Sequence, residues 1–267
     1  MSKRQLILRA DDAGSSTSAN EAMVKVIETG IVKNVSLMAV GPKIEEAAAK
    51  LKAYDSVCFG VHLVLNSEWD KVKWGPLTEL ELASGLVDQA GYFLADPKQF
   101  LETTPSVSVI MAEYEAQYQR LLDLGFKISY ADSHMFPESF IPGLQAAVDQ
   151  WTVEKGLLNH ADYYSVPPNV DKLINRDIRT LEFLKSVPAG QYFYVIHPAF
   201  DSAEMRQTGN SGVSGNQIAE ERDKEAKLFS KKMVKLTLKG LGVETIRYDQ
   251  AVKMPRIDLS SFLSKKK

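Results

Sequence analysis

The stretch Gln5-Leu-Ile-Leu-Arg-Ala-Asp-Asp-Ala-Gly14 decides the fold, because an apolar run ends there in two adjacent carboxylates, Asp11 and Asp12. Such a run predicts a buried strand, and α/β folds place their chemistry where strands end. Two carboxylates about 3 Å apart do not both stay ionised without a cation, so the pair favours a divalent metal ion beside it. The alternative is an ordinary aspartate-rich turn or helix cap.

Three of the four histidines stand at the ends of later apolar runs. The runs are Phe59-Gly-Val-His62-Leu-Val-Leu, Ile128-Ser-Tyr-Ala-Asp132-Ser-His134 and Tyr192-Phe-Tyr-Val-Ile-His197-Pro, and only His160 is left over. Each histidine alone could be a core residue whose ring is satisfied by hydrogen bonds. Taken together, an Asp/His/His set with a spare carboxylate is typical of a metal-assisted hydrolase.

The composition is that of a globular protein and argues against several classes. Hydrophobic residues make up 45% and charged residues 25%, and a net charge of -2 gives no reason to expect nucleic-acid or membrane partners. Cys58 is the single cysteine, which excludes an intrachain disulfide and a thiolate zinc site. Neither a signal peptide nor a membrane-spanning run is recognisable, so we expect a cytoplasmic protein.

Strand-like and helix-like runs alternate six or seven times along the chain, which predicts an α/β fold with a parallel sheet and outer helices. We expect residues 1–267 to form a single domain, a distorted (β/α) barrel. The stretch from about 66 to 105 shows no sustained helical or strand periodicity of its apolar residues. It is expected to be a long loop excursion with one short helix.

The second half of the chain predicts a strand near 158–164 and a helix over about 170–186. The glycine-rich Gln207–Gly215 is interpreted either as a mobile lid or as a surface loop. A long helix is expected over about 217–239, with a buried face formed by Ala226, Phe229, Met233 and Leu236.

Four further residues are candidates for supporting or binding roles. Asp132 could orient an imidazole or be a ligand itself. Trp69 and Trp74 lie among charged residues of the excursion and could stack on a sugar, or could pin the loop to the barrel. Arg222 could contact substrate or a site carboxylate, with a solvated helix face as the alternative.

Five blocks of this sequence resemble the YdjC family of carbohydrate deacetylases, in the family's order. The family's Ala-Asp-Asp-Phe-Gly corresponds to residues 10–14 and its Gly-hydrophobic-His-Leu to residues 60–63. Its Asp-Ser-His corresponds to residues 132–134, its His-Pro to residues 197–198 and its Arg-x-x-Glu to residues 222–225. The resemblance therefore covers nearly the whole chain.

The resemblance implies a distorted (β/α) barrel that binds one divalent metal ion and removes N-acetyl groups from amino sugars or chitooligosaccharides. Carried over by position, it implies Asp12, His62 and His134 as metal ligands, Asp11 as general base and His197 as general acid. The ion would be Mg²⁺ or Zn²⁺, with Mn²⁺ or Co²⁺ as alternatives. The implied partner is an N-acetylated saccharide, and the family suggests a homodimer.

The chain departs from the family pattern at three positions. Arg9 stands where the family often has His or Asn, Ala13 stands where it has Phe, and Phe136 stands where it often has a second His. These departures spare the implied ligands but bear on substrate choice and turnover. Two other functions stay open: another metal-dependent amidohydrolase or phosphoesterase, and a catalytically inactive sugar-binding relative. A phosphoesterase commonly needs more ligands or a second metal, and the spare carboxylate of Asp11 favours an enzyme over a binder.

Overall fold

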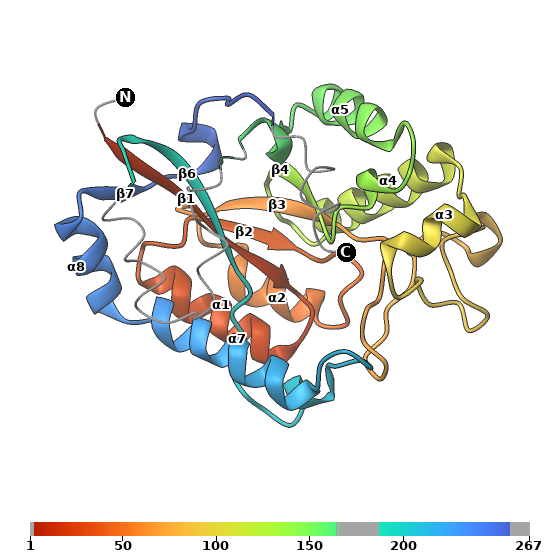
Figure 1. Cartoon of the computed structure of the whole chain (residues 1–267), viewed down its shortest axis with the longest axis horizontal. Coiled ribbons are helices and arrows are strands. Elements are labelled where there is room, and N and C mark those ends of the chain that lie inside the picture. The colour runs from red at the N-terminus through yellow and green to blue at the C-terminus, as the bar shows by residue number, and fades with distance from the viewer. Residues whose placement is uncertain (1–2, 164, 166–186, 257–267) are drawn as a thin grey trace.

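Seven parallel strands form one sheet at the centre of the described part of the chain. The computed structural model describes residues 3–163, 165 and 187–256. The strands lie in the order β5-β4-β3-β2-β1-β6, and β7 also pairs with β1 (Figure 1). Their bounds are β1 Arg4–Ala13, β2 Asn34–Leu37, β3 Cys58–Leu63, β4 Ile128–Ser133, β5 Leu158–Asn159, β6 Gly190–Ile196 and β7 Val243–Thr245.

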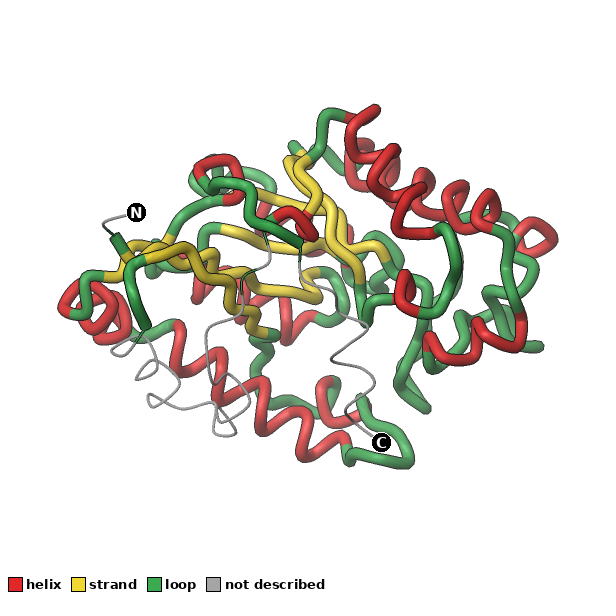
Figure 2. The backbone as a smooth tube through the Cα atoms, turned by 45° about the horizontal axis from the view of Figure 1, so that its top comes forward, coloured by secondary structure: helices red, strands yellow, loops and turns green. Residues whose placement is uncertain are grey.

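Strand β1 is the hub of this sheet. One edge of β1 pairs with β6 along Arg4–Ala10. The other edge pairs first with β7, along Arg4–Leu6, and then with β2, along Arg9–Ala13. The twisted strands curl into a half-barrel (Figure 2). Within the described residues the end strands β5 and β6 each pair with one neighbour only. The predicted distorted (β/α) barrel with a parallel sheet and outer helices is therefore confirmed, in the form of a half-barrel.

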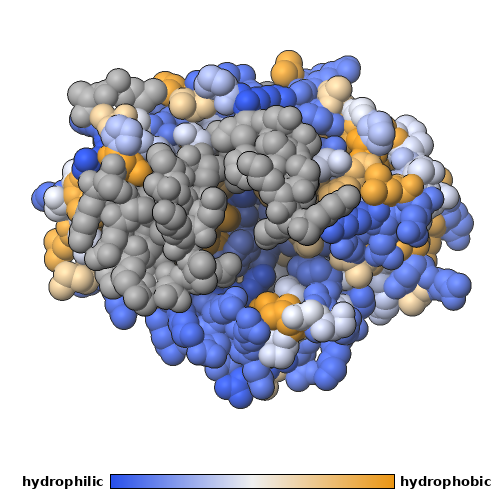
Figure 3. All heavy atoms as spheres, in the orientation of Figure 1, coloured by the Kyte–Doolittle hydropathy of each residue, from blue (hydrophilic) through white to orange (hydrophobic). Residues whose placement is uncertain are grey.

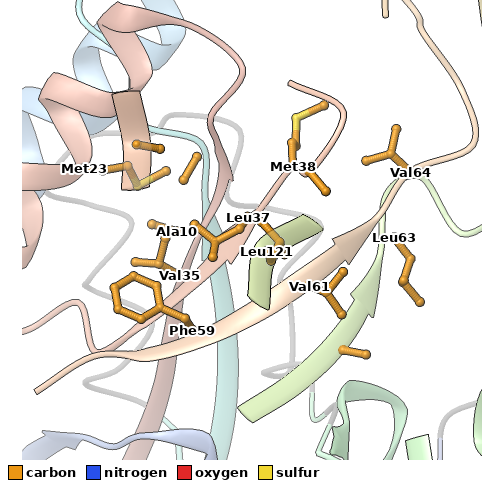
Figure 4. Close-up of a cluster of buried hydrophobic side chains, with 14 of the residues drawn as sticks. Ala10, Met23, Val35, Leu37, Met38, Phe59, Val61, Leu63, Val64 and Leu121 are labelled. Carbon is orange, nitrogen blue, oxygen red and sulfur yellow. The ribbon is translucent and has the colours of Figure 1, made fainter. Parts of the chain in front are cut away.

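Helices cover the outer face of the sheet and bury the main apolar core. Their bounds are α1 Thr17–Glu28, α2 Ile44–Leu51, α3 Phe100–Thr103, α4 Val107–Asp123, α5 Leu144–Lys155, α7 Gly215–Phe229 and α8 Lys232–Gly240. Outward-facing residues of β1, β2 and β3 form one cluster with Met23 of α1 and Leu121 of α4 (Figure 4). None of the helices in the described ranges is both long enough and apolar enough to cross a membrane.

The inner face of the sheet has an apolar floor and a polar rim. The floor contains Ile7, Cys58, Tyr130, Phe193 and Tyr248. Because side chains two residues apart on a strand point the same way, later residues of these strands also face inward. They are the buried polar residues Arg9 and Asp11 of β1, His62 of β3 and Asp132 of β4. Ser36 of β2 also faces inward, because its hydroxyl bonds Tyr130 and Asp132. Figure 3 shows a hollow near the middle of the molecule, with hydrophilic residues along the coloured part of its wall.

The predicted continuous helix over 217–239 is wrong. Lys231 takes an extended backbone conformation (φ -80°, ψ 128°), which ends α7 and starts α8 in a new rotational phase. Ala226 and Phe229 are buried as predicted, whereas Met233 and Leu236 are 62% and 60% exposed. Val234 is buried in their place.

Two other predictions for the second half have different outcomes. The strand expected near 158–164 shrinks to the two residues of β5, because a 3-10 turn at His160–Asp162 follows directly. The helix expected over 170–186 lies outside the described residues.

The predicted excursion at about 66–105 is a long loop region anchored to α4. It contains α3 and the 3-10 turns Leu80–Leu82 and Pro97–Gln99. Glu113 of α4 is fully buried and accepts hydrogen bonds from the backbone N–H groups of Leu77 and Thr78 and from the Thr78 hydroxyl. One buried carboxylate thus ties the excursion to the barrel.

Gly60 of β3 offers a test of how tightly the inner face is packed. A Cβ at this position would lie 2.2 Å from the ring of Tyr130, a fully buried residue whose hydroxyl bonds Ser36. We expect Gly60→Ala to lower the free energy of unfolding by about 1–3 kcal/mol through overpacking. Gly240→Ala is the control, because nothing lies within 4 Å of a Cβ there. Equal urea-unfolding midpoints for the two variants would contradict this expectation.

Candidate metal centre

Strand β1 contains an extra residue where the two aspartates lie. Ala10 pairs with Val35 of β2 and Ala13 with Leu37, so three steps along β1 face two steps along β2. Asp12 absorbs the difference in a left-handed backbone conformation with φ 69°. A bulge of this kind re-aims a side chain, and here it turns Asp12 away from the helix-covered face that strand alternation would give it.

Asp12, His62 and His134 converge on one buried point at the carboxyl end of the sheet. Asp12 Oδ1 lies 3.6 Å from His62 Nε2 and 3.7 Å from His134 Nδ1. The two ring nitrogens are 3.1 Å apart. The structure therefore brings together the three residues predicted as metal ligands, and their role as ligands stays a prediction.

The three donor atoms suit a divalent ion. Asp12 Oδ1 is buried and has no hydrogen-bond partner among the described residues, an arrangement that is costly unless a cation satisfies it. Tetrahedral ligands at about 2.0–2.2 Å from an ion are about 3.3–3.6 Å apart. The observed separations of 3.1, 3.6 and 3.7 Å are close to that range. Two imidazoles and one carboxylate would leave a position open for water or substrate.

Asp132 orients the His62 ring by binding Nδ1, the ring nitrogen that does not face Asp12. Its Oδ2 lies 2.6 Å from His62 Nδ1, and the two residues face each other in the register of β3 and β4. Ser36 donates a hydrogen bond of 2.7 Å to the other carboxylate oxygen. Burial opposes a charge on His62, but Asp132, with smaller contributions from Asp11 and Asp12, outweighs it and raises the pKa of His62 to about 9. Asp132 thus contacts an imidazole on the neighbouring strand, not the adjacent His134.

His134 has a carboxylate partner that sequence reasoning missed. Its Nε2 lies 3.1 Å from Glu68 Oε2, in the excursion. Asn210 donates to the Glu68 carbonyl oxygen at 3.1 Å, so the glycine-rich segment 207–215 holds the excursion in place beside His134. No spacing in the sequence distinguishes Glu68 from its charged neighbours, because the contact depends on how a loop folds back.

Arg222 reaches the site from α7. Its Nη1 lies 2.8 Å from Asp12 Oδ2, the oxygen turned away from the histidines. Burial opposes ionisation of Asp12, but Arg222 and the nearby histidines hold its pKa well below the ordinary value. Arg222 thus keeps Asp12 ionised, and a contact with substrate stays a prediction.

Asp11 points to the opposite side of the bulge and pairs with Arg9. Arg9 Nε and Nη2 donate to the two Asp11 carboxylate oxygens at 2.6 and 2.7 Å. Both residues are buried. The residue predicted as general base is therefore held in a bidentate ion pair by a residue at which this chain departs from the family pattern.

Comparison with known proteins identifies the family of this chain. The YdjC-like protein family model matches residues 5–158, more than half of the chain. The chain belongs to the YdjC-like family. A carbohydrate deacetylase of Thermoanaerobacter pseudethanolicus is 27% identical over 179 residues, covering 67% of each chain. A chitooligosaccharide deacetylase of Citrobacter koseri is 30% identical over 169 residues, covering 61% of this chain and 62% of that protein.

A solved structure shares the fold. It is a protein from Enterococcus faecalis V583 named for cellobiose-phosphate cleavage, and it superimposes with a TM-score of 0.76 at 18% identity. The match covers 94% of this chain and 100% of that one. At 18% identity the superposition shows that this YdjC-like chain shares the fold of that protein, and nothing beyond the fold.

His197, the predicted general acid of this YdjC-like chain, follows β6 at the same end of the sheet. Its backbone N–H donates to Glu225 Oε2 at 2.7 Å, and its side chain is half-buried. Burial is the main cause that lowers the pKa of His197, and Arg222 adds to it, while Asp12 and Asp11 act in the opposite direction. The neutral imidazole is therefore favoured near pH 7.

A pocket with an empty volume of about 460 Å³ opens beside Asp12, and Trp69 and Trp74 help to line it. Their exposed fractions are 9% and 5%, and both belong to the main core. Trp74 Nε1 donates to the Asn66 carbonyl at 2.7 Å, so this ring pins the excursion as well as lining the pocket. Stacking of a sugar on either ring stays a prediction.

The contact between Glu68 and His134 predicts how a metal ion is held. Glu68→Gln keeps the size of the side chain and removes its charge, so we expect about 10–100-fold weaker Zn²⁺ binding. His134→Ala should abolish binding, and Asp70→Asn, at an exposed carboxylate of the same segment, should change nothing. Competition against a chelating dye at fixed pH measures all three. Wild-type affinity in Glu68→Gln, alongside loss in His134→Ala, would show that Glu68 does not support the ligand.

Proposed function

We propose that this chain is a metal-dependent carbohydrate deacetylase that hydrolyses the N-acetyl group of an amino sugar or chitooligosaccharide. The observation that carries the proposal is the buried Asp12–His62–His134 triangle with Asp11 beside it, in a member of the YdjC-like family. Relatives named carbohydrate deacetylase and chitooligosaccharide deacetylase indicate the substrate class.

One divalent ion would be held by Asp12, His62 and His134. When bound, such an ion polarises an acyl carbonyl and acidifies a water molecule. The two imidazoles suit Zn²⁺, Co²⁺ or Mn²⁺ better than Mg²⁺, which prefers oxygen ligands. Asp132 and Glu68 fix the two rings so that Nε2 of His62 and Nδ1 of His134 face Asp12.

Asp11 would accept the proton that the attacking water loses. Arg9 occupies one hydrogen-bonding site on each Asp11 oxygen, and an ionised carboxylate offers about four, so two remain for water. His197 would donate a proton to the nitrogen of the leaving amine as the C–N bond breaks. The products are acetate and the free amino sugar.

The pocket beside Asp12 suits a neutral amide better than a phosphate ester. Among the described lining residues, Glu68 and Glu204 add negative charge to that of Asp12. Arg222 is the single cation of that lining, and it already pairs with Asp12. Apart from the proposed ion, a phosphate dianion would meet these carboxylates with no unpaired cationic side chain in the described lining, which disfavours the phosphoesterase alternative.

The proposal predicts acetate release from N-acetylated mono- and oligosaccharides by protein loaded with Zn²⁺, Co²⁺, Mn²⁺ or Mg²⁺ in turn. Asp11→Asn should keep the ion and lose about 10²–10⁴-fold in rate, the usual contribution of a general base. Asp12→Asn should lose the ion itself. Saccharide binding without acetate release under every ion would indicate an inactive sugar-binding relative instead.

The role of His197 predicts a particular pH profile. The protonated ring is the donor, so the rate falls as pH rises through its pKa. Because burial and Arg222 lower that pKa, the alkaline limb of kcat/KM should lie below the position set by an ordinary histidine, 6.5. His197→Ala should keep the ion, and it should lose the alkaline limb of the pH profile together with most of the deacetylation rate. An unchanged profile in this variant would mean that the amine takes its proton from elsewhere, such as water.

A further inference from the structure

The pocket beside Asp12 has apolar walls that come from three separate segments of the chain. The turn after β2, the excursion and the segment before α7 supply six apolar residues of the described lining: Met38, Pro42, Trp69, Val72, Trp74 and Met205. Met38, Trp69 and Trp74 are also members of the main core. Packing against the core therefore fixes these walls before any ligand binds.

Several polar side chains of the same lining are engaged with the protein itself. The two carboxylate oxygens of Glu204 accept hydrogen bonds from the first two backbone N–H groups of α1, each at 3.2 Å. The Ser16 hydroxyl caps the same helix by accepting from a backbone N–H at 3.0 Å. The Thr208 hydroxyl donates to a backbone carbonyl at 2.6 Å. These groups would have to give up or share their bonds in order to hold a ligand.

The remaining polar residues of the described lining leave little for a sugar to bond. Arg222 pairs with Asp12, and Glu68 contacts His134. Two buried atoms of the lining have no hydrogen-bond partner among the described residues: Asp12 Oδ1, which faces the histidines, and the Ser15 hydroxyl oxygen. A saccharide ring carries several hydroxyl groups, and each needs a new partner when it leaves water. The pocket therefore suits an apolar group better than a sugar ring.

An N-acyl amino sugar has one apolar substituent, which is the acyl chain. Its carbonyl would lie beside Asp12, because Asp12 is one of the three candidate ligands of the ion that would polarise this carbonyl. The carbonyl carbon bears the sugar nitrogen on one side and the acyl chain on the other, and the chain matches the apolar walls. The empty volume of about 460 Å³ far exceeds that of a methyl group, which is similar to the roughly 30 Å³ of a water molecule.

We propose that this pocket binds the acyl chain of the substrate, and that the protein hydrolyses N-acyl amino sugars with chains longer than acetyl, such as propionyl and butyryl. The inference rests on the proposed function and widens its substrate class. Water adds its oxygen to the carbonyl carbon, the C–N bond breaks, and the amine nitrogen gains a proton. The products are the longer carboxylate and the same free amino sugar.

Hydroxamic acids of increasing chain length test the pocket without any turnover. Acetohydroxamic, propionohydroxamic and butyrohydroxamic acids share one metal-binding head group and differ only in their alkyl chains. Isothermal titration into full-length protein loaded with Zn²⁺ measures the three dissociation constants. We expect the affinity to rise about four-fold for each buried methylene, and so about 16-fold across the series. An affinity that stays equal or falls along the series would overturn the inference.

A matched pair of variants shows whether the chain lies in this pocket. Val72→Phe enlarges a half-buried side chain of the lining, so it should remove the gain in affinity with chain length. Val252→Phe makes the same change at a residue that is 48% exposed and outside the lining, so it should keep the gain. A full gain in folded Val72→Phe would place the chain elsewhere and overturn the inference. If Val72→Phe does not fold, the wild-type series alone decides.

Release of acetate, propionate and butyrate from the matching N-acyl glucosamines separates this inference from the proposed function. We expect all three carboxylates to be released. Acetate release without propionate or butyrate release would overturn the inference and support a strict deacetylase. Hydroxamate binding that strengthens with chain length, with no carboxylate released from any of the three sugars, would support the acyl pocket and contradict the proposed function.

Discussion

The left-handed backbone of Asp12 is the constraint on which the site depends. A non-glycine residue in this conformation costs on the order of 1–3 kcal/mol, so its surroundings must hold it. The Asp12 carbonyl accepts from Ser15 N–H at 3.1 Å, and the next turn is fixed by Gly14 N–H donating to Asn20 at 2.8 Å. In a regular strand Asp12 would face the helices. The bulge sends Asp11 and Asp12 in different directions: Asp11 pairs with Arg9, and Asp12 joins His62 and His134 in a group that could hold a metal ion.

Charge pairing explains why so many ionised groups can be buried together. Asp11 has Arg9, Asp12 has Arg222, and Asp132 has both Arg9 and His62. Removing one partner from a buried pair typically costs about 3–5 kcal/mol, because the other charge is left without compensation. The network therefore couples the candidate ligands to the other buried charges of the inner face, so that loss of one partner leaves another charge uncompensated.

The sequence was sufficient to predict those features that follow from strand pattern. Polar residues at the ends of parallel strands must meet at one edge of the sheet, so a shared site of aspartates and histidines could be expected from the positions of the runs. The choice of Asp12, His62 and His134 as its ligand set came from the resemblance to the YdjC family, and the bulge that turns Asp12 into the site was not predicted. The contact of Glu68 with His134 could not be expected, because it joins a loop to a strand end across 66 positions. The break between α7 and α8 was missed for a different reason, since Lys231 and its neighbours carry no glycine or proline signal.

In the proposed function, the residues that carry the chemistry and those that would select the substrate lie in different parts of the structure. The strands β1 and β3, together with the residue that follows β4, supply the three candidate donor atoms, and positions on or next to the sheet hold such groups more precisely than loops do. The pocket beside them is built largely from the excursion and from the segment around Met205 and Thr208. Loops tolerate change far better than strands, so relatives can share the buried triangle and still differ in the N-acyl saccharide they accept. Glu68 links the two parts, because it lies in the loop that shapes the pocket and yet orients a ring of the triangle.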